Sequence, residues 1–211
     1  MHGQKFGRWN LIFINVRFLH VGRRNSNFNY EMNGEWIMEV EEEKDVGIII
    51  SNDLKSSKQC TAACNQANQY LGFIYKYVEY KSPLVMTLLY NCYVRPKLEY
   101  GVRVVQPHYQ QDLDKMEAVQ RRFTRMVIGM EGLEYRERLK ALNMFSIKRR
   151  LLRGDMIEVY KLFSGLVDLD VRKFFTLETE RRTRGHDKKI KKESCRLDIR
   201  KYSFSHRVVD F

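Results

Sequence analysis

The order of apolar and polar residues changes character near residue 53. Before that point, apolar and polar side chains alternate on both sides of Asn33-Gly34, in the segment NFNYEMNGEWIMEV over 27–40. Asn-Gly between two alternating runs is typical of a β-hairpin with a type I′ turn, because both central residues of that turn need positive φ. The run VGIII over 46–50 predicts a further strand, and its glycine indicates a bulge or the close approach of another backbone.

From residue 53 onward the apolar residues recur at every third or fourth position, which predicts helices. A second helix is expected to begin at Ser82-Pro83, its N-cap and first position, and to end or bend at Pro96. The first helix is expected to bury one apolar face, made of Ala63, Ala67, Leu71, Ile74 and Val78. The inward face of the second is predicted to consist of Leu84, Leu88 and Cys92.

Three more helices are predicted before residue 166. Asp112 is expected to cap the first of them, which closes at Gly129, and a short helix follows over about 133–142. Ser146 is expected to cap a long helix that closes at Gly165. The residues expected to face inward are Leu113, Met116, Val119, Phe123 and Met126 on the helix capped by Asp112, and Met156, Val159, Tyr160 and Phe163 on the long helix.

The predicted fold is therefore mainly α with a small antiparallel β region. An N-terminal hairpin and strands are expected over 1–52, a helical bundle over 53–165, and a basic C-terminal segment over 166–211. Residues 172–207 hold thirteen Lys and Arg against five acids, with little apolar periodicity. This composition predicts a loosely ordered segment with short helices at most.

Charge is spread unevenly along the chain. The formal net charge is +12, and residues 1–50 contribute none of the excess, because their six basic residues are offset by seven acids. The positive charge of the remaining residues is typical of a protein with a polyanionic partner, most simply nucleic acid. It is equally typical of a basic surface that only keeps a protein in solution, so charge leaves both interpretations open.

The cysteines and tyrosines allow alternatives of their own. Four cysteines without the spacing of a disulfide framework favour a reducing, intracellular compartment. The sequence does not determine the localisation, and nucleus and cytoplasm both stay open. Cys60 and Cys64 could help to bind zinc but match no zinc pattern, so buried helix cysteines are favoured. The cluster Tyr70, Tyr75, Tyr77 and Tyr80 could stack on bases, although packing inside the bundle is favoured. No stretch reaches transmembrane length, and no membrane partner is expected.

One long series of motifs carries a family resemblance. It starts with YEMNGEWIMEVEEEKDVGIIISNDLKSSKQC and continues through ANQYLGFIYKYVEYKS, LYNCYVRPKLEYGV, DLDKMEAVQRRFTRMVIGM and YRERLKALNMFSIKRRLLRGDMIEVYKLFSG to RTRGH and HRVV. In order and over nearly the whole chain, these motifs resemble the C-terminal part of reverse transcriptases from non-LTR retrotransposons, the LINE elements of the jockey-like group. The chain would then run from the end of the palm, over 1–52, through the primer grip and the thumb to a basic tail.

The resemblance implies two nucleic-acid contact regions. Lys44, Asp45, Val46, Gly47 and Ile48 resemble the primer grip, a hairpin that positions the 3′ end of the growing strand. The helical bundle resembles a thumb, which holds a template–primer duplex, here an RNA/DNA duplex, through phosphate contacts. The residues expected to make those contacts are Arg121, Arg122, Arg125, Lys148, Arg149, Arg150 and Arg153 on the helices, with Arg182 and Arg184 in the tail.

The chain lacks what the family's chemistry requires. Intact relatives would use Mg²⁺ held by an aromatic-x-Asp-Asp motif of the palm, and no Asp-Asp pair occurs anywhere in this sequence. We therefore expect no catalytic residue, no metal and no cofactor, and at most binding of template–primer nucleic acid. Two alternatives stay open, namely an unrelated basic helical module that binds nucleic acid and a structural or partner-binding helical bundle.

Overall fold

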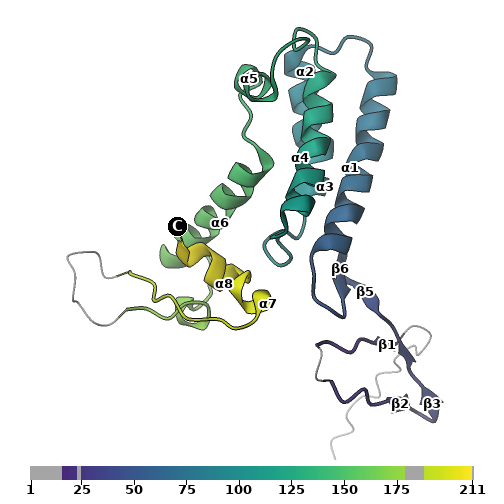
Figure 1. Ribbon diagram of the computed structural model, residues 1–211, viewed down its shortest axis with the longest axis vertical. Helices are drawn as coiled ribbons and strands as arrows, with labels where there is room; N and C mark the ends of the chain where they lie inside the picture. Colours follow the sequence, from purple (N-terminus) through teal and green to yellow (C-terminus); the bar gives the residue numbers. More distant parts are fainter. Residues whose placement is uncertain (1–15, 23–24, 179–187, 211) are drawn as a thin grey trace, which may run out of the picture. The chain divides into compact units, whose positions relative to one another are not determined.

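The computed structural model describes residues 16–22, 25–178 and 188–210. The chain divides into two compact units, Met1–Leu54 and Lys55–Phe211. Over the described residues, the first contains only short strands and the second only helices and turns, apart from one isolated bridge (Figure 1). The predicted fold class, mainly α with a small β region, is confirmed.

The first unit, called the β unit, consists of three two-stranded pairs in its described part. Its strands are β1 (Arg17–Phe18), β2 (Glu31–Met32), β3 (Glu35–Trp36), β4 (Met38–Glu39), β5 (Glu42–Asp45) and β6 (Ile48–Ser51). β2–β3 and β5–β6 are antiparallel hairpins, whereas β1 pairs with β4 in parallel. Edge-to-face contacts of Phe18 with His20 and Tyr30, at 4.9 Å between ring centroids, add a small aromatic cluster.

The two hairpins have the same kind of turn but different turn residues. Asn33 (φ 55°) and Gly34 (φ 85°) form the predicted type I′ turn between β2 and β3, which confirms the hairpin. Val46 (φ 46°) and Gly47 (φ 81°) occupy the matching positions between β5 and β6. The strand predicted over 46–50 is therefore confirmed from Ile48 onward, as part of β6, whereas Val46 and Gly47 form a turn in which the glycine supplies positive φ rather than a bulge.

The second unit, called the helical unit, is built mainly from long helices. Its described elements are α1 (Ser57–Tyr77), α2 (Pro83–Leu89), the π-helical turn η2 (Tyr90–Val94), α3 (Arg95–Glu99), α4 (Gln110–Arg125), α5 (Tyr135–Ala141), α6 (Ile147–Phe163), the 3₁₀ turn η3 (Val171–Lys173), α7 (Asp198–Lys201), α8 (Phe204–Arg207) and the 3₁₀ turn η4 (Val208–Asp210). α1 packs against η2, α3 and α4, and α4 packs against α5 and α6 (Figure 1). No helix of the described residues is long and apolar enough to span a bilayer.

The core lies between α1, the α2–η2–α3 helix and α4. The buried face predicted for α1 is confirmed for Ala63, Ala67, Leu71 and Ile74. Phe123 of α4 stacks on the fully buried ring of Tyr90 at 4.4 Å between centroids. The buried members of this main core are Cys60, Cys64, Ala67, Leu71, Ile74, Met86, Tyr90, Val94, Leu98, Val102, Met116, Val119, Phe123, Val127, Met130, Leu142, Ile147 and Leu151.

The α2–η2–α3 helix buries a different face from the one predicted. Leu84, Leu88 and Cys92 are exposed, and the series two residues further along is buried instead, namely Met86, Tyr90, Val94 and Leu98. Both series are apolar and share a spacing of four, so neither is favoured by its pattern. Pro96 does not end the helix, which passes through the π-helical turn just before it.

Predicted helix starts are confirmed at two serines and wrong at one aspartate. Ser82 and Ser146 cap α2 and α6 by accepting hydrogen bonds from the N–H groups of Val85 and Arg149. α4 begins before Asp112, which is fully buried and accepts a 2.6 Å hydrogen bond from the Ser57 hydroxyl. Asp112 therefore connects α4 to the start of α1. A buried carboxylate is costly unless it accepts hydrogen bonds, and the Ser57 hydroxyl supplies one.

The C-terminal segment joins a second, smaller core on α6. Leu162, Phe175 and Val208 are its buried members, and Met156, Val159 and Phe163 pack around them. Tyr160, expected to face inward, is exposed. Residues 166–211 belong to the same compact unit as the helices, and within their described part they form α7, α8 and two 3₁₀ turns.

Candidate nucleic-acid interface

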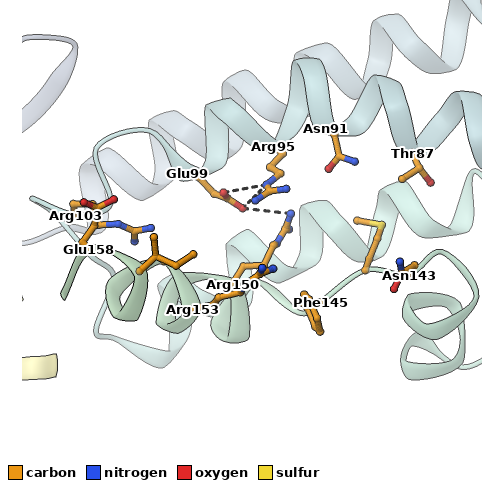
Figure 2. A pocket seen from close by; sticks show the side chains of 13 residues that line it. Thr87, Asn91, Arg95, Glu99, Arg103, Asn143, Phe145, Arg150, Arg153 and Glu158 are labelled. Carbon is orange, nitrogen blue, oxygen red and sulfur yellow. Dashed lines mark hydrogen bonds and ion pairs between the residues drawn. The ribbon is translucent and has the colours of Figure 1, made fainter. Parts of the chain in front are cut away.

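A polar groove of about 540 Å³ lies between the α2–η2–α3 helix and α6. Figure 2 shows side chains from both helices and from the α5–α6 connection turned toward it. Arginine is its commonest residue, with four members. The lining residues are Thr87, Asn91, Arg95, Glu99, Arg103, Asn143, Met144, Phe145, Arg150, Arg153, Gly154, Ile157 and Glu158.

Glu99 forms ion pairs with two of these arginines. The Arg95 Nε donates to both carboxylate oxygens of Glu99 at 3.1 Å, and Nη1 of Arg150 lies 3.3 Å from Oε1 (Figure 2). The Glu99–Arg150 pair connects α3 to α6 across the groove, whereas the Arg95–Glu99 pair lies within α3. Because the two arginines share one carboxylate, this wall of the groove keeps a net charge of about one positive unit.

Arg150 is a structural residue rather than a surface cation. Its side chain is only 8% exposed, and Nη2 donates to the Tyr90 hydroxyl at 2.9 Å and to the Gln120 carboxamide oxygen. Burial raises the pKa of Tyr90 to about 12, which the neighbouring Arg150 partly opposes. The expectation that Arg150 reaches a phosphate thus conflicts with its position, since its Nη1 and Nη2 groups bond Glu99, Tyr90 and Gln120 inside the bundle.

Gln120 connects α4 to α5 and to the start of α6. It is fully buried, and its Nε2 donates to the Tyr135 hydroxyl at 2.9 Å and to the Phe145 carbonyl at 3.0 Å. Tyr135 in turn donates to Glu117, which also accepts the Ile147 N–H at 2.9 Å. Burial, followed by the hydrogen bond to Glu117, raises the pKa of Tyr135. The network holds Tyr135 and Phe145 in fixed relation to each other.

Three exposed arginines lie over these two rings. The guanidinium carbon of Arg121 is 5.1 Å from the Tyr135 centroid, and those of Arg149 and Arg153 are 4.8 and 5.9 Å from the Phe145 centroid. We call these five residues the arginine–aromatic cluster. Among the described residues, no carboxylate forms an ion pair with any of the three arginines. A guanidinium over a ring keeps its N–H edge available to an anion.

The other predicted contact residues are not part of the cluster. Arg122 is exposed and its Nη1 donates to the Asn68 carboxamide on α1 at 3.4 Å. Arg125 and Lys148 are exposed, on α4 and α6 respectively. Arg182 and Arg184 lie outside the described residues.

An ion-pair network at Asp155 escaped the sequence prediction. Asp155 is buried and accepts hydrogen bonds from Arg207 at 3.0 Å to each oxygen and from Arg103 at 3.3 Å. Gly154 leaves room for the Arg103 side chain, because a Cβ at this position would lie 1.7 Å from the Nη2 of Arg103. The only signal for this network in the sequence is the Gly154-Asp155 pair within a predicted helix. It does not identify Arg103 or Arg207 as partners, since each lies about 50 residues away.

The primer-grip-like residues lie in the β5–β6 hairpin of the β unit. Lys44 pairs with Ile49 and Asp45 with Ile48, and Val46 and Gly47 form the exposed turn. The five predicted residues thus share one hairpin. Its strand β5 also carries Glu42 and Glu43, so the hairpin brings acids as well as Lys44 together.

The described residues contain no group of three or more His, Cys, Asp or Glu side chains arranged to hold a metal ion. Cys60 and Cys64 are buried, as predicted. Burial, followed by the nearby Asp112, raises the pKa of Cys60 to about 12, and burial raises that of Cys64 to about 11. Both thiols are therefore protonated at neutral pH.

Comparison of the chain with known protein families, curated proteins and solved structures finds no match.

Proposed function

We propose that this chain is a non-catalytic fragment of a retrotransposon reverse transcriptase that binds template–primer duplex through its helical unit. The observation that supports it best is the arginine–aromatic cluster. Three guanidinium groups from two helices, each held over a ring and none ion-paired within the described residues, form a surface suited to phosphate oxygens.

The cluster suits a sequence-independent partner. Arg121, Arg149 and Arg153 present only N–H donors, and the rings beneath them are joined through the Gln120 carboxamide. Phosphate contacts of this kind position a duplex without reading its bases, and each one releases counterions. Binding should therefore depend strongly on salt and weakly on sequence.

Fluorescence anisotropy with a labelled RNA–DNA hybrid tests the proposal. The affinity should fall about tenfold or more between about 50 mM and about 200 mM salt, because several phosphate contacts are made. An affinity that salt leaves unchanged, or the absence of binding, would favour a structural or partner-binding bundle. Equal affinity for hybrid and duplex DNA would favour an unrelated basic module.

A charge-matched pair of variants tests the cluster itself. Arg149→Gln with Arg153→Gln should weaken hybrid binding about tenfold. The slope of log affinity against log salt concentration should decrease by about two, as expected for the loss of two phosphate contacts. Arg136→Gln with Lys140→Gln removes the same charge from exposed positions of α5 and should change the affinity about twofold at most. Equal losses in the two double variants would mean that net charge, and not the cluster, attracts the duplex.

Primer extension with Mg²⁺ tests the expected lack of catalysis. The purified chain should extend no primer, because two-metal phosphoryl transfer needs carboxylates that hold the ions. The readout is the length of a labelled primer annealed to an RNA template. Extension that disappears with chelator would contradict the proposal.

A further inference from the structure

The outer side of α1 carries an exposed aromatic row that the arginine–aromatic cluster does not use. Tyr70, Phe73 and Tyr77 follow one another at spacings of three and four, which places them along one stripe of the helix. Phe73 is 59% exposed and Tyr77 69% exposed, and Tyr93 of η2 beside them is 51% exposed. We call these four residues the aromatic platform. The sequence favoured packing inside the bundle for the four tyrosines at 70, 75, 77 and 80. That prediction is wrong for Tyr75, Tyr77 and Tyr80, which are all exposed.

Three of the four platform rings, those of Tyr70, Phe73 and Tyr93, contact one another. Tyr70 and Tyr93 lie nearly parallel, 6.2 Å apart with 16° between their planes, and Phe73 meets Tyr70 edge-on at 6.4 Å. Tyr70 itself is half-buried against the main core. Exposed rings on a rigid helix lose little entropy when they bind a flat ligand, since their positions are already restricted.

Lysines surround the platform and carboxylates are almost absent from it. Nζ of Lys97 lies 5.3 Å from the Tyr70 centroid and Nζ of Lys76 lies 5.3 Å from the Tyr77 centroid. Glu79 is the only acid in residues 54–98, which hold six Lys and Arg. The nearest acid of α3, Glu99, is paired with Arg95 and Arg150. The chemistry of this surface therefore matches a ligand with both flat rings and negative charge.

We infer that the aromatic platform binds single-stranded nucleic acid, with bases stacked on its rings and phosphates close to Lys76 and Lys97. Every base has a π-face, so stacking tolerates any sequence, and lysines beside the rings follow the backbone. The exposed amides of Gln66 and Gln69, one turn before Tyr70 and Phe73, can donate to base edges. The inference rests on the proposed function, because it adds a single-strand site to a duplex-binding chain.

The charge distribution favours this ligand over a protein partner. A docking surface for protein is typically poor in lysine at its centre and rich in continuous apolar area. Here two lysines lie directly over the rings, where an apolar partner would have to remove their hydration. A strand of nucleic acid keeps those charges paired.

The test is fluorescence anisotropy of a labelled oligothymidylate of about twenty nucleotides, measured beside the RNA–DNA hybrid. Phe73→Ala with Tyr77→Ala should weaken single-strand binding about tenfold to a hundredfold, as expected for the loss of two stacked bases. Hybrid affinity should stay within about twofold. Both side chains are mostly exposed, so circular dichroism should show an unchanged fold.

Two controls separate stacking from other roles of the same surface. Tyr160→Ala removes an exposed tyrosine from α6 and should leave single-strand affinity unchanged. Phe73→Leu keeps the apolar area but loses the ring, so it should still weaken binding several-fold if stacking is the cause. Wild-type affinity in Phe73→Leu, or equal losses in the Tyr160 variant, would overturn the inference.

The outcomes also distinguish this inference from the proposed function. A chain that binds hybrid normally and single strands equally well with and without Phe73 and Tyr77 refutes the platform alone. A chain that binds neither nucleic acid refutes both. A concentration-dependent dimer, seen by light scattering and lost in the double variant, would show that a second copy occupies the surface and would overturn the inference.

Discussion

The β unit and the helical unit of this chain differ in what holds them together. In the described part of the β unit only His20 and Ser51 are buried, and Trp36 and Met38 are largely exposed. In the helical unit, eighteen buried apolar residues form one continuous core. The strands are therefore held mainly by short hydrogen-bonded pairs and tight turns, and the helices by removal of apolar surface from water.

This difference indicates how each unit responds to change. Two-stranded hairpins are marginal in water without a hydrophobic face to pack on, so their stability depends on turn chemistry. A packed bundle depends on volume and on satisfied buried polar groups. The two tryptophans of the chain, Trp9 and Trp36, both belong to the first unit. Tryptophan fluorescence therefore reports on the β unit and far-ultraviolet circular dichroism on the helices.

The largest effect is expected from Phe123→Ala. Phe123 is fully buried and stacks on Tyr90, so its removal should cost about 3–5 kcal/mol of unfolding free energy in the helical unit. Urea denaturation followed by circular dichroism measures the loss. Trp36→Ala, at a side chain 71% exposed, should change stability by about 0.5 kcal/mol or less. Similar losses in both variants would contradict the contrast between the units.

The buried polar network gives the next largest effect. Gln120→Leu removes the acceptor of the buried Tyr90 hydroxyl and the donor to the Phe145 carbonyl, and it takes one hydrogen bond each from Tyr135 and Arg150, which should cost about 2–3 kcal/mol. Gln111→Leu changes an exposed residue of the same helix and should cost about 0.5 kcal/mol or less. A Gln120→Leu variant more stable than wild type would mean that the Gln120 carboxamide does not form these hydrogen bonds.

Alkaline pH should weaken the helical unit. The folded chain keeps the proton on Cys60, whose pKa is raised from 9.0 to about 12, while the unfolded chain loses it near the ordinary value. The contribution of Cys60 to the free energy of unfolding is therefore fully present below about pH 9 and is lost as the pH rises toward about 12. The urea midpoint, followed by circular dichroism, should fall between about pH 8 and about pH 10.5.

Cysteine variants assign the pH effect to its source. Cys60→Ala should reduce the fall in midpoint between the two pH values, because one buried titrating group is gone. Cys92→Ala removes an exposed thiol and should leave the pH dependence unchanged. An undiminished fall in Cys60→Ala would assign the whole effect to other groups, such as Tyr90, whose pKa burial raises to about 12.

The smallest effect is expected from the turn of β5–β6. Val46 has φ of 46°, a conformation that a β-branched residue adopts at a cost of about 1–2 kcal/mol. Val46→Asn should recover about 1 kcal/mol and slow hydrogen exchange at the β5–β6 amides. The reciprocal change, Asn33→Val, should speed exchange in β2–β3. Unchanged exchange in both variants would mean that neither turn limits its hairpin.

The sequence alone determined the features that depend on nearby residues. Asn33-Gly34 predicted a type I′ turn, and Ser82 and Ser146 predicted helix starts, because positive φ and capping hydrogen bonds are decided within a few residues. Gly165, with φ of 68°, likewise follows the end of α6 as predicted. The helical period from residue 53 onward predicted the fold class for the same reason.

Only the tertiary structure decided which side of each helix is buried. Leu84 and Leu88 form as good an apolar series as Met86 and Tyr90, and the contact with α1 selects the second series. Arg149 and Arg150 are adjacent and identical, yet one lies over Phe145 at the surface and the other bonds Tyr90 inside the bundle. Burial depends on partners that lie dozens of residues away, and no local pattern contains that information.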